Sequence, residues 1–377
     1  MILQTLDIKD NCTGVFYKNK FLFDKKVKAA IENCNISWKH SPILNDESYE
    51  YLYLYLKEKD LASFSLDSEM YEEYQIKMRA HQRAAETAKI EMVDICFFDI
   101  IPENQLSKWF RIREQSLKKL YATIRRPFDY DILHKAHVLA TEISHNKIAY
   151  ENGLSRVRYN IFGSATGRFT TEKNSIPILN LKKEKRSSLR PGNDLFLELD
   201  FNAAELRTLL SLSGREQPDI DIHEWNVENV FHRKISRAKA KQRVFAWLYN
   251  PEAIDKSLEK YYNREIFRDF FSEDKQILTT PYNRELPVEE RKAQNYLLQS
   301  TTSDIVIENA YKVMKLLKDR RSKIAFTLHD SIILDFARED YGLVKDIKMA
   351  FETTRLGSFL SNVKIGKNFG EMRELEV

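Results

Sequence analysis

The sequence predicts an α+β fold, in which long helices accompany an antiparallel sheet. Two apolar runs, "DLFLELDF" (194–201) and "KIAFTLHDSIILDF" (323–336), have the length and composition of buried strands, and the second has two apolar arms around a polar His-Asp centre. Charged, helical patterns fill long stretches elsewhere. With 377 residues, 43% of them hydrophobic, the chain is long enough for two or three compact units.

The N-terminal part divides into two kinds of pattern. Residues 1–66 mix short apolar runs with polar breaks, and "GVFYKNKFLF" predicts a hairpin around Lys18 and Asn19, although the role of this region is unknown. From residue 67 the pattern is helical, with breaks at Pro102 and Pro127. The predicted helices lie near 68–92, 103–122 and 129–148.

The remaining elements follow in order. "RVRYNIFGSATGRFTT" (156–171) alternates like strands, punctuated by Gly163 and Gly167. After the strand at 194–201, a helix over 202–214 is expected to end at Gly214. The pattern then predicts mostly helix over 215–277, another helix over 287–318, and a hairpin at 323–336 whose turn exposes "HDS".

Charge and cysteine content narrow the class of protein. The formal net charge is only +4, but the runs "LKKEKRSSLR" (181–190) and "HRKISRAKAKQR" (232–243) are strongly basic and suit phosphate contacts. Three scattered cysteines predict neither a disulfide framework nor a zinc site. Since no apolar stretch has the length of a membrane span, we expect a soluble, cytoplasmic protein.

One helical stretch, "RAKAKQRVFAWLY" (237–249), combines cations with rings. Residues four apart share a helix face, so Arg237, Lys241, Phe245 and Tyr249 form one basic–aromatic stripe. The simpler interpretation is an amphipathic helix with Phe245, Leu248 and Tyr249 in the core and solvated cations. The alternative is a working surface, with cations for a polyphosphate and rings for a base.

Two aspartates stand at strand ends. Asp200 ends one apolar strand, and Asp330 lies at the turn between two others. If these strands adjoin in one antiparallel sheet, both carboxylates meet at its edge, where Mg²⁺ takes one or two carboxylates plus substrate phosphates. A pair of such metals suits phosphoryl transfer. Taken singly, each aspartate is more typical of an ordinary turn or helix cap, and only the two together favour a metal site.

These motifs together resemble the polymerase region of a family A (polymerase I type) DNA polymerase. "LDFNAAELR" (199–207) resembles the family's motif A, the basic–aromatic stripe follows motif B (R-x3-K-x3-F-x3-Y), and "LHDS" (328–331) stands for motif C. Three further segments match in the same order: "TGRFTT" (166–171), "DIH" (221–223) and "RKAQNYLLQSTTSD" (291–304). Six matches in order are specific where any one is weak.

The resemblance implies a right-hand polymerase fold with an antiparallel palm sheet, helical fingers and a helical thumb. The expected ranges are 67–155 for the thumb, 156–214 and 301–377 for the palm, and 215–300 for the fingers. The implied function is a template-directed DNA polymerase, a nucleotidyltransferase that adds dNTPs to a primer 3′ end by two-metal chemistry.

The same resemblance implies roles for individual residues. Arg237 and Lys241 would bind the triphosphate with help from His223, and Lys241 would also protonate the leaving pyrophosphate. Phe245 would pack beside the sugar, and Tyr249 would stack near the templating base. Glu205 would crowd the 2′ position of the sugar. Two Mg²⁺ would be held by Asp200, Asp330 and the main-chain carbonyl of Phe201. The expected contacts to primer-template DNA are Arg168, Asn180, Asn295, Gln299 and His329.

The chain departs from the family pattern at several points. Ser331 replaces the usual motif C glutamate, which implies altered metal affinity or primer-end handling. Ala246, Asn250 and Asn283 stand where glycines are common; asparagine tolerates left-handed backbone, and alanine suits a helix. Only about 150 residues precede "TGRFTT", so the resemblance implies a compact phage-like form without a proofreading exonuclease domain, despite the short "LDSE" at 66–69.

Two other functions compete with a DNA polymerase. A single-subunit RNA polymerase shares a related palm, but Glu205 and Phe245 count against it because those enzymes keep the gate position small and lack that aromatic. A catalytically inactive, polymerase-like DNA-binding protein would have no need of Asp200 and Asp330. For a DNA polymerase, a separate exonuclease or a processivity partner is possible.

Overall fold

The computed structural model describes residues 3–6, 12–17 and 20–23, isolated positions between 72 and 89, and residues 128–376 apart from 152 and 174. The chain divides into two compact units, Met1–Tyr130 and Asp131–Val377. In the first, β1 (Leu3–Leu6), β2 (Cys12–Tyr17) and β3 (Lys20–Phe23) form an antiparallel sheet. Tyr17 pairs with Lys20, which confirms the hairpin predicted there.

Only part of the predicted N-terminal helices can be assessed. Within 68–92, residues 72, 75, 76, 79, 80, 83, 84 and 87 are helical, whereas the helix expected at 103–122 and the "LDSE" segment lie outside the described residues. The helix expected at 129–148 is α7 (Tyr130–His145). Because the second compact unit begins at Asp131, nearly all of α7 belongs to that unit; the domain boundaries themselves stay predictions.

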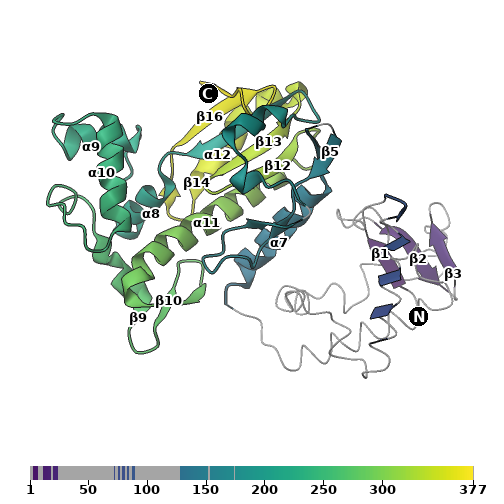
Figure 1. Cartoon of the computed structure of the whole chain (residues 1–377), viewed down its shortest axis with the longest axis horizontal. Coiled ribbons are helices and arrows are strands. Elements are labelled where there is room, and N and C mark those ends of the chain that lie inside the picture. The colour runs from purple at the N-terminus through teal and green to yellow at the C-terminus, as the bar shows by residue number, and fades with distance from the viewer. Residues whose placement is uncertain are drawn as a thin grey trace. The chain divides into compact units, whose positions relative to one another are not determined.

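A five-stranded antiparallel sheet in the order β12-β13-β8-β16-β17 forms the centre of the second unit (Figure 1). Its strands are β8 (Leu195–Phe201), β12 (Lys323–Leu328), β13 (Ser331–Phe336), β16 (Ser361–Gly366) and β17 (Arg373–Glu374). The strand at 194–201 and the hairpin at 323–336 are therefore confirmed, and they adjoin. The mixed α+β class is confirmed with them.

From Leu197 to Phe201, the alternation along β8 separates apolar residues on one face from acidic residues on the other. Leu197, Leu199 and Phe201 are buried, and Phe201 stacks on Phe351 of α12 (Val344–Glu352) with ring centroids 4.2 Å apart. Successive strand residues point to opposite faces. Glu198 and Asp200, which are half-buried, consequently share the other face.

Short elements connect the sheet to α7. The hairpin of β4 (Lys147–Tyr150) and β5 (Gly153–Arg156) follows α7 directly. The alternation predicted over 156–171 yields only the two-residue strands β6 (Tyr159–Asn160) and β7 (Thr170–Thr171), because the residues between them form turns. The rest of the unit contains η3 (Ile178–Asn180), η4 (Lys183–Ser188), η6 (Arg338–Leu343), β14 (Thr353–Thr354) and β15 (Gly357–Ser358).

Residues 204–287 form a helical region with a small sheet. Its helices are α8 (Ala204–Leu212), α9 (Ile222–Asn229), α10 (Arg237–Tyr249) and η5 (Arg264–Phe270). Gly214 adopts a left-handed conformation (φ 66°) after α8, as the predicted helix end requires. The expectation of mostly helix over 215–277 is wrong beyond Tyr249, where Asn250 and Pro251 end the helix and turns follow. A sheet of β9 (Phe271–Ser272), β10 (Ile277–Thr279) and β11 (Glu285–Pro287) completes the region.

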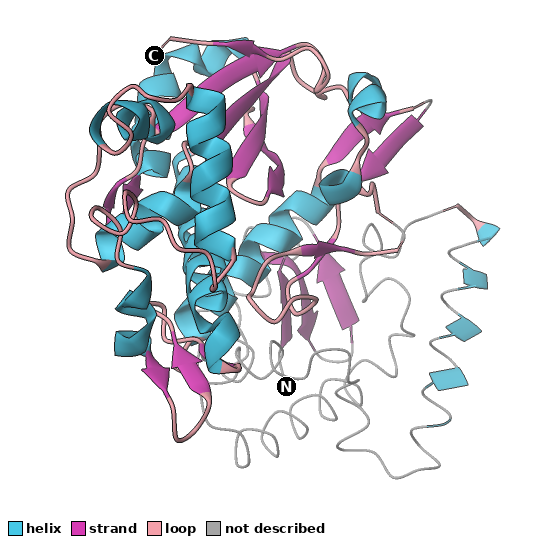
Figure 2. Ribbon diagram, turned by 60° about the vertical axis from the view of Figure 1, so that its left-hand side comes forward, coloured by secondary structure: helices cyan, strands magenta, loops and turns pink. Residues whose placement is uncertain are grey.

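One long helix, α11 (Glu290–Leu316), packs against the small sheet, α10 and the large sheet (Figure 2). Leu297 packs in a cluster with Leu278 of β10, Leu298 in a cluster with Trp247 of α10, and Ile305 in the core of the large sheet. The helix predicted at 287–318 is thus confirmed. Among the helices in the described ranges, none has the length and apolar character that crossing a membrane requires.

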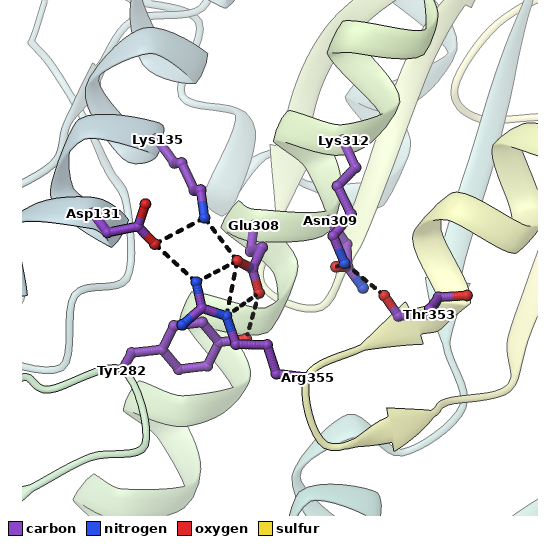
Figure 3. A network of polar contacts seen from close by, with 8 residues as sticks. All are labelled: Asp131, Lys135, Tyr282, Glu308, Asn309, Lys312, Thr353 and Arg355. Atoms are coloured by element: carbon purple, nitrogen blue, oxygen red, sulfur yellow. Dashed lines mark hydrogen bonds and ion pairs between the residues drawn. The ribbon is translucent and has the colours of Figure 1, made fainter.

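A buried ionic network holds α11 to its surroundings (Figure 3). Glu308, only 4% exposed, accepts hydrogen bonds from Lys135 of α7, Tyr282 and both Nε and Nη2 of Arg355. Asp131 also bonds Lys135 and Arg355. Three separate segments therefore donate to one carboxylate of α11.

Candidate active site

Asp200 and Asp330 lie at one edge of the large sheet. Asp200 is opposite Ser331 in the antiparallel register of β8 and β13, and His329 and Asp330 form the two-residue turn between β12 and β13. The backbone amide of Phe201 donates to the carbonyl of Asp330 over 3.1 Å. The condition on which the sequence-based metal site depended, that these strands adjoin, is met.

Both carboxylates lie in an environment that disfavours their charge. Burial, followed by repulsion from Asp330 and Glu198, raises the pKa of Asp200 to about 7. Burial likewise raises the pKa of Asp330, although His329, Arg168 and Lys241 act in the opposite direction. Within the described part of the chain, no group of three or more His, Cys, Asp or Glu side chains is arranged to hold a metal. The site thus offers two carboxylates whose charged forms a cation would stabilise, and the rest of the cation's ligands would come from water or substrate.

Glu198 is a third carboxylate that the sequence interpretation missed. It lies two residues before Asp200 on the same face of β8, and its Oε2 is 3.8 Å from Nζ of Lys364 on β16. Burial raises the pKa of Glu198, while Lys364 lowers it. The alternation in "LFLELDF" could have revealed this placement, because it puts both acids on one face.

The basic–aromatic stripe is a continuous, accessible face of α10. Ala240, Val244, Trp247 and Leu248 are the buried residues of the helix. Phe245 is half-buried and Tyr249 is 38% exposed, and their rings stack with centroids 5.8 Å apart. Nζ of Lys241 lies 5.6 Å from the Phe245 centroid. The amphipathic alternative agrees with the buried Leu248, the partly packed Phe245 and the exposed cations, but it is wrong for Tyr249, which is exposed.

Glu205 connects α8 to the stripe. Tyr249 donates its hydroxyl to Oε2 of Glu205 over 2.6 Å, and Arg168 forms an ion pair with the other carboxylate oxygen. Burial raises the pKa of Glu205, against the effect of both donors. Motif A, motif B and the "TGRFTT" segment thus meet at a single side chain.

His223 and Arg237 lie at the N-terminal ends of α9 and α10. The ring of His223 is 2% exposed and packs edge-on to Phe245 with centroids 5.6 Å apart. Its Nδ1 is buried without a hydrogen-bond partner among the described residues, and burial lowers the pKa of His223 to about 4. Arg237 forms a bidentate ion pair with Asp221, which the sequence interpretation did not foresee.

The five residues expected to contact DNA fall into groups. Arg168 and His329 line one small cavity of about 20 Å³. Tyr249 and Asn295 line a larger pocket of about 410 Å³ together with Arg291, and Asn295 donates to the carbonyl of Tyr249 over 3.3 Å. Asn180 is exposed at the end of η3, and Gln299 is half-buried on α11.

A buried ion pair fixes the backbone before Arg168. The single Nε–H of Arg284 is shared between both carboxylate oxygens of Asp304, at 2.9 and 3.0 Å, and Nη2 donates a further bond; Asp304 is completely buried. Gly167 has φ 76°, and a Cβ added there would lie 2.7 Å from Cζ of Arg284. Only glycine fits both the conformation and the space. The packing of Gly167 against Arg284 therefore fixes the backbone position directly before Arg168.

Comparison with known proteins identifies sequence relatives. No family model matches the chain. It is 24% identical over 237 residues to a DNA polymerase I of Caldicellulosiruptor bescii, covering 49% of this chain and 28% of that protein. It is 22% identical over 317 residues to a DNA polymerase I of Chloroflexus aurantiacus (69% of this chain, 34% of the relative) and 25% identical over 297 residues to a DNA polymerase of Bacillus phage SP01 (58% and 32%).

The matches cover only part of these relatives. A solved structure titled as the POL domain of Pol1 from M. smegmatis in complex with DNA primer-template and dNTP aligns with a TM-score of 0.48 and 14% identity, covering 71% of this chain and 54% of that one. The chain spans about a third of the length of the curated relatives it matches. The resemblance to polymerase I type DNA polymerases predicted from the motifs is thus confirmed, at modest identity over much of the chain.

Proposed function

We propose that the chain is a DNA-directed DNA polymerase, which adds dNTPs to the 3′ end of a primer paired with a template. The observation that carries the proposal is the meeting of Asp200 and Asp330 at one sheet edge, where Lys241 of the basic–aromatic stripe is close enough to act on the pKa of both. Similarity to curated DNA polymerases supports it.

In this proposal the chain has a right-hand layout. The palm comprises 156–214 and 301–377, whose strands β8, β12, β13, β16 and β17 share the large sheet. The fingers comprise 215–300, which contain α9, α10 and the small sheet. The thumb comprises 67–155.

The donor set suits magnesium. Burial makes the charged forms of Asp200 and Asp330 unfavourable without a cation, and Mg²⁺ usually takes one or two carboxylates and completes its shell with water and substrate phosphates. Asp200, Asp330 and the carbonyl of Phe201 would hold two Mg²⁺, which supply activation of the attacking hydroxyl and neutralisation of phosphate charge.

The chain's own residues then position and stabilise the reactants. The primer 3′ oxygen forms a bond to the α-phosphorus of the dNTP as the bond to the pyrophosphate oxygen breaks. Arg237 and Lys241 bind the triphosphate, Lys241 donates a proton to the leaving pyrophosphate, and His223 contributes an uncharged ring. Phe245 packs beside the sugar, and Tyr249 stacks near the templating base.

The remaining residues select the sugar and hold the duplex. Glu205 closes the 2′ side of the sugar, which favours DNA over RNA synthesis because its oxygens are already hydrogen-bonded to Tyr249 and Arg168. Arg168 and His329 contact the primer end, and Asn180, Asn295 and Gln299 contact the primer-template duplex.

A primer-extension assay on the full chain tests this function. We expect Mg²⁺-dependent extension of a labelled primer with dNTPs, which EDTA stops and added Mg²⁺ restores, and far weaker extension with rNTPs. Asp200→Ala and Asp330→Ala should lose extension but keep duplex binding, whereas Asp346→Ala, an exposed position on α12, should behave as the parent. Equal use of rNTPs would favour an RNA polymerase, and duplex binding without extension by the parent would favour an inactive binding protein.

A further inference from the structure

The carboxylate of Asp221 is the point where three segments meet. Its Oδ1 accepts from the backbone amides of His223 and Glu224, each over 2.9 Å, and so caps α9. Oδ1 and Oδ2 also accept from Nε and Nη2 of Arg237, over 3.1 and 2.6 Å. The side-chain amide of Asn202 donates to Oδ2 over 2.7 Å.

These contacts connect the metal edge with the nucleotide helix. Asn202 directly follows β8, and its Oδ1 accepts from the amide of Ile222 over 2.9 Å. Arg237 is the first residue of α10. The distance along the backbone from Asp200 to Arg237 is long, but Asn202 and Asp221 make the connection in two side-chain hydrogen-bonding steps.

The ion pair with Asp221 orients the Arg237 guanidinium but leaves it free to bind a further anion. Its side chain remains 47% exposed, against 20% for Asp221, and a guanidinium carries five N–H donors, of which the ion pair occupies two. Burial by itself would raise the pKa of Asp221, but its hydrogen bonds from Arg237, the Glu224 amide and Asn202 outweigh this and hold the pKa well below its usual range. Asp221 is therefore charged at any pH at which the protein is used.

We propose that Asp221 is a positioning residue for the nucleotide: it holds the Arg237 guanidinium toward the triphosphate and ties the start of α10 to the end of β8. This inference rests on the proposed function. Asp221 does not touch the nucleotide itself. The opposite possibility is that Asp221 competes with the triphosphate for Arg237, and the two possibilities predict changes of opposite sign when the carboxylate is removed.

The test is Asp221→Asn, with Asp219→Asn as a matched control at an exposed position two residues away. Asparagine is a good helix N-cap, so the cap of α9 is kept while the ion pair is lost. We expect the KM for dNTP to rise about tenfold to a hundredfold, the range for losing a hydrogen bond to a charged group. The kcat and the affinity for primer-template should change little. A lower KM would establish competition, and an unchanged KM would overturn the proposal.

A double-mutant cycle separates positioning from helix capping. If Asp221 acts through Arg237, Asp221→Asn has no further effect on KM in an Arg237→Gln background. An undiminished effect there would show that the cap alone matters. Should Asp221→Asn not fold, Asp221→Ser, which keeps one side-chain oxygen for α9, replaces it; failure of both variants to fold would assign Asp221 a structural role and overturn the proposal.

Calorimetric binding of dATP with Mg²⁺ to the protein bound to a primer-template whose primer lacks its 3′ hydroxyl gives a readout independent of turnover. The parent protein's extension activity tests the proposed function. If the parent extends primers and Asp221→Asn binds dATP normally, only the present inference fails. If the parent binds dATP without extending primers, the proposed function fails while the binding comparison still decides the role of Asp221.

Discussion

Glu205 is held by two donors from distant parts of the chain, Tyr249 on α10 and Arg168 in the "TGRFTT" segment. A carboxylate fixed in this way cannot turn aside at little cost when an extra hydroxyl approaches it. Tyr249 consequently has two separable features under the proposed function, a ring that faces the template and a hydroxyl that holds Glu205.

We predict that Tyr249→Phe weakens sugar selection without removing the stacking ring. The variant loses the hydrogen bond that Tyr249 donates to the largely buried Glu205 carboxylate, so ribonucleotide incorporation should rise roughly tenfold or more relative to the parent. Glu205→Ala should raise it further. The measurement is the ratio of rNTP to dNTP incorporation efficiency on one template. Unchanged selectivity in both variants would place the sugar gate elsewhere.

Phe245 gives a second prediction for a single residue. If its ring packs against the sugar, nothing on it replaces the 3′ hydroxyl that a dideoxynucleotide lacks, and the parent should reject such terminators. Phe245→Tyr adds an oxygen at that place and should improve acceptance roughly tenfold to a hundredfold. The ratio of dideoxy to deoxy incorporation decides it, and equal ratios in both proteins would mean that Phe245 does not face the nucleotide.

At the scale of elements, Glu308 joins α7, α11, the Tyr282 loop and the turn between β14 and β15 (Figure 3). Burial would raise the pKa of Glu308, but hydrogen bonds from Arg355 and Lys135 reverse this and lower it. A carboxyl group with a lowered folded-state pKa stabilises the fold above its unfolded-state pKa. That stabilisation is lost as the pH falls through the folded-state pKa.

Glu308→Gln should therefore destabilise the protein by on the order of 3 kcal/mol at pH 7, because it removes the buried anion and leaves Lys135 and Arg355 with only the exposed carboxylate of Asp131 as a partner. The difference from the parent should be smaller at an acid pH below the lowered folded-state pKa of Glu308, where the parent's Glu308 is protonated as well. Urea unfolding at both pH values measures this. Glu339→Gln, which breaks only the exposed pair with Arg321, should cost less than about 1 kcal/mol; an equal loss would refute the special role of Glu308.

Local patterns predicted the elements that depend on near neighbours. The hairpin at 323–336 and the strand at 194–201 follow from apolar runs around polar turns, and α11 follows from its long helical pattern. The small sheet of β9, β10 and β11 was missed because its strands are two or three residues long. The pairing of Asp221 with Arg237 was missed because it depends on how α9 and α10 pack, which neither helix specifies alone.

At the scale of the whole second unit, α11 supplies side chains to three separate hydrophobic clusters. One cluster contains Leu278, another Trp247 and the third Phe326. We predict that these clusters open together. In hydrogen exchange followed by mass spectrometry, Leu298→Ala should accelerate exchange of the slowest amides in β8 and β13 as well as in α10. Trp225→Ala, at a half-buried position on α9, serves as the comparison. Acceleration confined to α10 would show that the clusters are independent.

The order of strands in the large sheet also has a consequence during synthesis. β8 lies between β13 and β16, and both of these neighbours come later in the chain, at 331–336 and 361–366. When Asp200 leaves the ribosome, the strand that carries it has no partner for its backbone groups, and it must wait for more than a hundred further residues. Such long-range pairing slows folding and exposes an apolar strand meanwhile. The segment that carries Asp200 and Phe201 of the proposed metal site would therefore benefit from protection by a chaperone while the chain is being made.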